Sequence, residues 1–132
     1  MRPGWSGAWV VSVMAGQPFE VRIIGGVPVV SAPEEIDISN AGDFRAAFQS
    51  AAGHSTVVAD LSVTEYCDSS GLNVLVRALR RLQEQGGELR LVARTSAVLR
   101  ILNVTGVGKM LKVYASLEDA LADRAPTFAP TC

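Results

Sequence analysis

The stretch from Thr56 to Leu82, TVVADLSVTEYCDSSGLNVLVRALRRL, constrains the fold more than any other part of the chain. It opens with the β-branched apolar run of residues 56–61, which is typical of a buried strand. It closes with apolar residues at the spacing of one helical face, namely Leu72, Leu75, Val76, Leu79 and Leu82. Between them lies Cys67-Asp68-Ser69-Ser70-Gly71. Because Asp and Ser side chains accept hydrogen bonds from the unpaired amides of a first helical turn, this segment predicts a helix beginning near Ser70.

The rest of the domain alternates between strand and helix patterns. Residues 19–24 and 27–30 are two β runs joined by Gly25-Gly26, which is typical of a hairpin. Apolar spacing predicts helices over 41–52, from a cap at Thr95 or Ser96 to about residue 105, and over 117–122, with strands over 88–93 and 110–114. The order ββαβαβαβα predicts an α/β domain with one mixed sheet and helices packed mainly on one side. The residues expected to be buried together are Phe48, Leu61, Leu75, Leu79, Leu91 and Leu99.

A chain of 132 residues suits one domain, which we place at residues 18–124, between an arm at 1–17 and a tail at 125–132. In the arm, Trp9, Val11 and Val13 alternate with other residues, which predicts an extra strand. That strand would pack on the domain or on a second copy in a weak homodimer. The arm also resembles a secretory signal, but its apolar run is at the short end and no A-x-A site follows. Met14 is an alternative natural start.

Composition and motifs exclude several functional classes. A net charge of −1 without clustered Lys and Arg argues against nucleic-acid binding, and no apolar run is long enough to span a membrane. Cys67 and Cys132 have no CxxC partner, so we expect neither a metal site nor a redox motif. No dinucleotide or P-loop motif follows a strand, which predicts no cofactor. The serines lack G-x-S-x-G flanks and a nearby base, and His54 is a lone turn residue, so we expect no catalysis.

Two interpretations of Asp68-Ser69-Ser70-Gly71 remain open from physics alone. The first is a helix N-cap and nothing more. The second is a phosphate site, because a cap needs only one short polar residue whereas three precede a glycine here. A phosphate is also favoured by the amides and dipole at a helix start.

These residues also carry a family resemblance, which extends from about Phe19 to Leu121. The run D-S-S-G-L at residues 68–72, placed between a strand and a helix, resembles the signature of the anti-sigma factor antagonists, bacterial single-domain members of the STAS superfamily. Glu35-Ile36-Asp37 resembles the second landmark of that family, G-E-[IL]-D. Glu34 stands at the usual glycine of this landmark, which puts its tight backbone in doubt. Asn73 replaces a common glycine, which should stiffen the first helical turn and place a polar side chain on the docking face.

The resemblance implies a phosphorylation-controlled binding protein in the cytoplasm. In that family, the serine matching Ser69 is phosphorylated by a partner that is both an anti-sigma factor and an ATP-dependent serine kinase, and a PP2C-type phosphatase removes the phosphate. The unphosphorylated form binds the anti-sigma factor and thereby frees a sigma factor. The implied partner-binding residues are Asp37, Asp68, Ser70, Gly71, Leu72 and Asn73. The alternative is a STAS-type domain that binds a ligand or scaffolds an assembly without a kinase partner.

Overall fold

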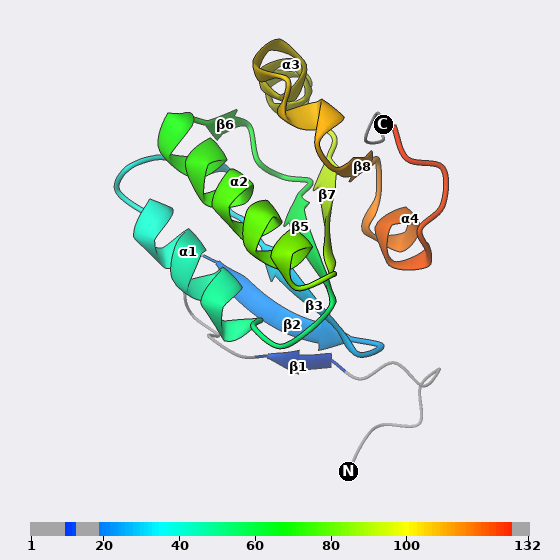
Figure 1. Ribbon diagram of the computed structural model, residues 1–132. Coiled ribbons are helices and arrows are strands. Elements are labelled where there is room, and N and C mark those ends of the chain that lie inside the picture. Colours follow the sequence, from blue (N-terminus) through cyan, green and yellow to red (C-terminus); the bar gives the residue numbers. More distant parts are fainter. Residues whose placement is uncertain (1–9, 13–18, 128–132) are drawn as a thin grey trace.

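A computed structural model describes residues 10–12 and 19–127, and within these residues the chain forms a six-stranded mixed sheet (Figure 1). The strand order is β1-β2-β3-β5-β7-β8. The bounds are β1 Val10–Ser12, β2 Glu20–Ile24, β3 Val27–Ser31, β5 Thr56–Leu61, β7 Glu88–Ala93 and β8 Lys112–Tyr114. The pairs β1–β2 and β2–β3 are antiparallel, whereas β3–β5, β5–β7 and β7–β8 are parallel. The predicted hairpin and the mixed sheet are therefore confirmed.

Three of the described helices cover one face of this sheet and the fourth covers the other. The helices are α1 Ala41–Ser50, α2 Ser69–Glu84, α3 Ser96–Thr105 and α4 Leu117–Ala122. Side chains of α1, α2 and α3 belong to the larger core, whereas Ala120 of α4 packs on the opposite face with Val29, Val58 and Val92. The prediction that the helices lie mainly on one side is confirmed. Among residues 10–12 and 19–127, no helix is both long and apolar enough to cross a bilayer.

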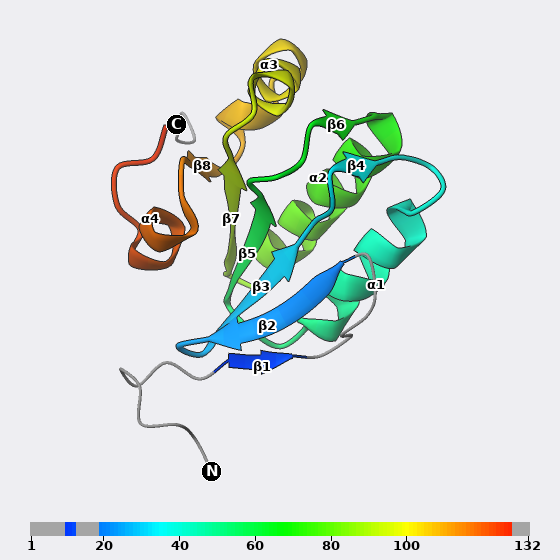
Figure 2. The same cartoon turned by 180° about the vertical axis from the view of Figure 1, so that it is seen from behind.

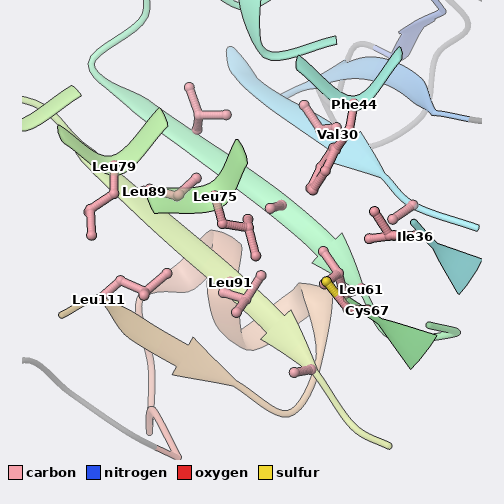
Figure 3. Close-up of a cluster of buried hydrophobic side chains, with 14 of the residues drawn as sticks. Val30, Ile36, Phe44, Leu61, Cys67, Leu75, Leu79, Leu89, Leu91 and Leu111 are labelled. Atoms are coloured by element: carbon pink, nitrogen blue, oxygen red, sulfur yellow. The ribbon is translucent and has the colours of Figure 1, made fainter. Parts of the chain in front are cut away.

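The larger core follows from the two periodicities of the sequence. Every second residue of β5 and β7 points toward the helices, so that Leu61 and Leu91 meet Leu75 and Leu79 of α2 (Figure 3). Phe44 of α1 stacks on Phe19, with ring centroids 4.7 Å apart. The residues predicted to be buried together do belong to one cluster, although Phe48 and Leu99 are only partly buried.

Two short strands were not predicted. β4 (Glu35–Ile36) and β6 (Tyr66–Cys67) pair in parallel as a separate two-stranded sheet, in segments that the sequence pattern presents as loops. Two residues are too few to show an alternation, so only the pairing itself defines these strands.

The predicted element boundaries shift by a few residues. α1 ends at Ser50 rather than residue 52, and α2 begins at Ser69, one residue before the prediction. β8 begins at Lys112 rather than Met110, because a 3₁₀ turn over Val107–Lys109 follows α3.

The arm contributes one described strand. β1 lies at the edge of the sheet, where Val11 is paired with Ile23 of β2. Trp9 and Val13, the other residues of the predicted alternation, lie outside the described residues.

Candidate functional site

The short β4–β6 sheet joins the two segments that the sequence analysis singled out. The amide of Asp68 donates to the carbonyl oxygen of Ile36 at 3.1 Å, and the amide of Glu65 donates to that of Glu34 at 2.7 Å. Figure 2 shows the two strands beyond the main sheet, beside the start of α2. Ile36 and Asp68 are joined by this hydrogen bond, and Asp37 follows Ile36 in the chain as Ser69 follows Asp68. The tertiary structure therefore brings Asp37 close to Ser69 at the start of α2.

Asp68 is the N-cap of α2. Its Oδ1 accepts hydrogen bonds from the amides of Ser70 at 2.8 Å and Gly71 at 3.3 Å, and its carbonyl oxygen accepts from Leu72 at 3.1 Å. The capping interpretation of the sequence is thus part of the structure. These amides are therefore already satisfied by the protein itself.

Gly71 is buried and has no room for a side chain. A Cβ atom at this position would lie 2.6 Å from Sγ of Cys67 and 2.7 Å from Cγ2 of Ile36. Both neighbours are core residues on the paired strands β6 and β4 (Figure 3). Gly71 therefore lets α2 begin directly against the β4–β6 sheet, a packing requirement that local sequence reasoning missed.

The same packing makes Cys67 a protonated thiol. Burial, followed by the nearby Asp68 charge, raises the pKa of Cys67 to about 12. Since the thiolate is the reactive form of cysteine, Cys67 is a core residue rather than a nucleophile.

Ser69 is the first residue of α2 and is exposed. Within residues 10–12 and 19–127, its hydroxyl group has no hydrogen-bond partner, and the side chain that caps α2 is that of Asp68. Ser70 and Leu72 are half-buried, whereas Asn73 is exposed one turn further along the helix. Of the consecutive serines, Ser69 is thus the more accessible.

Asp37 shapes the turn that leads into α1. Its Oδ1 accepts from the amide of Ser39 at 2.9 Å and from the Ser39 hydroxyl at 2.5 Å. The Ser39 side-chain bond is the main cause that holds the pKa of Asp37 below its ordinary value. The amide of Asp37 donates to Oδ1 of Asn40 at 2.9 Å, and Nδ2 of Asn40 donates to the Glu35 carbonyl at 2.8 Å. Asp37 is thus a negatively charged side chain in a turn held by several hydrogen bonds.

A buried threonine ties the site to α3. The hydroxyl of Thr64 donates to the backbone carbonyl oxygen of Pro33 at 2.8 Å. The hydroxyl of Thr95 in turn donates to the backbone carbonyl oxygen of Thr64 at 2.6 Å. Thr95 is also the N-cap of α3, so the structure decides between the two predicted candidates, Thr95 and Ser96. The segment between β5 and β6 is therefore held on both sides.

Exposed apolar residues also lie in these chain segments, at Ile38 beside Asp37 and at Val63 and Tyr66 before Ser69, and the sequence analysis missed them. The exposed fractions are 79% for Ile38, 57% for Val63 and 50% for Tyr66. Large apolar side chains exposed beside a polar site are typical of protein-binding surfaces. In the sequence, each of these residues is only an isolated apolar residue in a polar segment. Such a pattern does not show whether the side chain is exposed or buried.

The same surface is acidic. Glu34, Glu35 and Glu65 are exposed on or beside the β4–β6 pair, next to Asp37 and Asp68. In the described ranges, no group of three or more His, Cys, Asp or Glu residues is arranged to hold a metal ion.

Glu34 takes the place of the family glycine without a strained backbone. Among the described non-glycine residues, only Asp123 and Ala125 have a positive φ. The carbonyl oxygen of Glu34 still accepts from Glu65 and Tyr66, at 2.7 and 3.2 Å. The doubt about the backbone at this landmark is therefore resolved, since no glycine is needed.

The chain resembles known proteins in both sequence and fold. The STAS domain family model matches residues 18–120. The anti-sigma-F factor antagonist RsfB of Mycobacterium tuberculosis is 32% identical over 102 residues, which are 73% of this chain and 80% of RsfB. The crystal structure of an anti-sigma factor antagonist from Mycobacterium paratuberculosis has a TM-score of 0.72 at 30% identity, over 86% of this chain and 92% of that one.

SpoIIAA has the same fold in two solved forms. Its unphosphorylated form has a TM-score of 0.63 at 19% identity, over 86% of this chain and 94% of that chain. The phosphorylated form of this Bacillus cell fate determinant has a TM-score of 0.60 at 18% identity, over 86% and 97%. At this identity the likeness concerns the fold alone.

The family match decides between a regulator and an enzyme. The anti-sigma factor antagonists of this family are regulatory binding proteins, which confirms the expectation that the chain is not an enzyme. The family model matches residues 18–120, the predicted α/β fold is present, and both the sequence relatives and the solved structures include anti-sigma factor antagonists. The chain therefore belongs to the STAS domain family.

Proposed function

We propose that this protein is an anti-sigma factor antagonist controlled by phosphorylation of Ser69. In the unphosphorylated state it binds an anti-sigma factor that is also a serine kinase, and so releases a sigma factor. The observation that carries the proposal is the exposed Ser69 hydroxyl, without a hydrogen-bond partner among the described residues, at the start of a helix already capped by Asp68. A serine needed for the cap itself would be a poor acceptor of a phosphoryl group.

The surface around Ser69 suits a basic partner with an apolar patch. Exposed Ile38 and Tyr66 supply apolar area, and the surrounding carboxylates supply negative charge. Complementary charge chiefly increases the association rate and specificity, whereas the apolar residues contribute most of the affinity. We keep Asp37, Asp68, Ser70, Leu72 and Asn73 as the predicted contacts. Gly71 is buried and would support this surface from beneath by packing.

A phosphate on Ser69 adds close to two negative charges beside Asp68. Since Asp68 already occupies the amides of Ser70 and Gly71, the phosphate gains little from the first helical turn. Repulsion from Asp68 at ~6 Å in water costs ~1 kcal/mol, and the helix dipole returns ~0.3–1 kcal/mol. The free domain should therefore keep its fold and nearly all of its stability.

The effect of phosphorylation then arises at the interface. The phosphate dianion must lose bound water when the partner docks, which costs free energy. It also changes the shape and charge of the surface that the partner contacts. A loss of ~2.7 kcal/mol would weaken binding ~100-fold. A PP2C-type phosphatase would restore binding.

The test is binding and phosphorylation with the cognate anti-sigma factor. Ser69→Ala should bind and resist phosphorylation, whereas Ser69→Glu should bind ~100-fold more weakly at unchanged unfolding free energy. Ser70→Ala is the matched control and should still be phosphorylated. Phosphate on Ser70 in the parent protein, or full binding by Ser69→Glu, would contradict the proposal.

A further inference from the structure

A hollow lies between α1 and α2, in the half of these helices farther from Ser69. Its volume is about 110 Å³, and residues 45–53 and 74–85 supply nearly all of its lining. Its apolar lining consists of Phe48, Val57, Val74, Ala78 and Leu82, with Ala51 and Ala52 at the end of α1. We call this feature the arginine groove, after the three side chains described below.

The hollow exists because small residues line part of the space between the two helices. Figure 1 shows α1 and α2 side by side on one face of the sheet. Packed helix axes lie ~8–10 Å apart, and side chains normally fill the space between them. Ala78 of α2 and Ala51, the C-cap of α1, have only methyl groups, which are too small to fill this space. Phe48, Val74 and Ala78 are accordingly only partly buried, which leaves apolar surface open to a ligand.

Three arginines line the groove without any acidic residue. Arg45 comes from α1, and Arg77 and Arg81 come from α2. In the described part of the chain, none of the three makes an ion pair or a hydrogen bond. Arg90 and Arg124, by contrast, are both paired with carboxylates.

Helix stability alone does not account for this placement. Arg81 is in the last turn of α2, where the helix dipole favours a cation. Arg77 is a turn earlier and four residues from Arg81, so the two like charges repel each other. Arg45 is at the middle of α1, whose last turn has no basic residue. A bound anion would relieve the repulsion and use all three groups.

We propose that the arginine groove binds a small amphipathic anion. Its apolar part would occupy the hollow, and a carboxylate or phosphate group would lie among the guanidinium groups. A cavity of ~150 Å³ accepts benzene, so about 110 Å³ suits a short branched aliphatic group. The planar guanidinium fork pairs with either acid group through two parallel hydrogen bonds.

This site is separate from the proposed switch. Arg81 is twelve residues beyond Ser69 on α2, or ~18 Å along the helix. Ligand binding at the groove therefore requires no change at Ser69, and the two proposals can fail independently.

The test is an NMR titration of the full ¹⁵N-labelled chain with 4-methylpentanoate and with isopentyl phosphate. At least one should give saturable shifts at amides of residues 45–53 and 74–85. Acetate, which lacks the apolar group, and isopentylamine, which carries the opposite charge, should bind at least ~10-fold more weakly. Binding of neither anion, equal binding of the amine, or shifts centred on another surface would overturn the proposal.

Two variants and a control separate the charge from the hollow. Arg77→Glu should weaken binding ~10-fold or more, and Ala78→Leu should do the same by filling the hollow, both with unchanged circular dichroism. Arg100→Glu changes an exposed arginine of α3 and should leave affinity as in the parent. Unchanged affinity in Arg77→Glu would refute the role of the arginines. Groove shifts that depend on protein concentration without ligand would instead assign the groove to a second copy of the chain and overturn the proposal.

Discussion

Gly71→Ala tests the close approach on which the candidate site is built. The added methyl group would meet Sγ of Cys67 at 2.6 Å and Cγ2 of Ile36 at 2.7 Å, both closer than carbon contacts allow. Neither neighbour can swing into solvent, because Ile36 is fully buried and Cys67 is nearly so. The start of α2 must therefore move away from the β4–β6 pair.

Two effects of opposite sign set the size of the change. Overpacking a core by a methyl group costs ~1–3 kcal/mol, and two contacts with immobile neighbours favour the upper half of that range. Alanine in place of glycine in a helix returns up to ~1 kcal/mol. The free energy of unfolding should therefore fall by ~1–2 kcal/mol in Gly71→Ala.

Gly42→Ala is the matched control. Gly42 occupies the first turn of α1 as Gly71 does that of α2, but a Cβ atom at Gly42 meets nothing within 4 Å. This variant should gain ~0.5–1 kcal/mol from helix propensity alone. The difference between the two variants isolates the steric cost at Gly71.

Urea unfolding followed by circular dichroism measures both variants. The midpoint should fall for Gly71→Ala and rise for Gly42→Ala, with the same m-value. In a Cys67→Ala background, one of the two close contacts is removed, so Gly71→Ala should cost ~1 kcal/mol less than in the parent. If Gly71→Ala stabilises the protein as Gly42→Ala does, the close approach does not exist and this account of the site is wrong.

Three further predictions concern the scaffold. Thr95→Val removes the cap of α3 and the bond to the loop before β6, and should lower the unfolding free energy by ~1–2 kcal/mol in urea. The pKa of Asp123 is lowered chiefly by the hydroxyl of Tyr114, so its stabilisation is present above the ordinary carboxyl pKa near 4 and is lost as the pH falls further. Acid unfolding should accordingly depend less steeply on pH between 5 and 2 in Asp123→Asn, as thermal melts at each pH would measure. In a Cys132→Ser background, Cys67 of the folded protein should not react with a thiol reagent at pH 8, since burial raises its pKa to about 12. It should react after unfolding in urea, and rapid modification of the folded protein would contradict the buried thiol.

Sequence patterns among residues close together in the chain predicted most of the main helices and strands. The alternation in β5 and β7 and the apolar spacing in α2 predicted the core correctly, because strand and helix periodicities place side chains without reference to the rest of the chain. The cap at Asp68 was predictable for the same reason, since it binds amides two and three residues away.

Contacts between distant residues decided the candidate site, and no local pattern contains them. Asp37 and Ser69 are brought together by two-residue strands that exist only because they pair with each other. The need for glycine at position 71 comes partly from Ile36, which lies thirty-five positions earlier in the sequence, as well as from the nearby Cys67. The arginine groove likewise depends on which faces of α1 and α2 meet, because each arginine alone resembles an ordinary solvated helix residue. The sequence by itself therefore determined the strands of the main sheet, the main helices and the cap of α2. Tertiary packing alone brought the β4 segment and Asp37 beside the start of α2, because that segment is close to Ser69 in space and far from it in the chain.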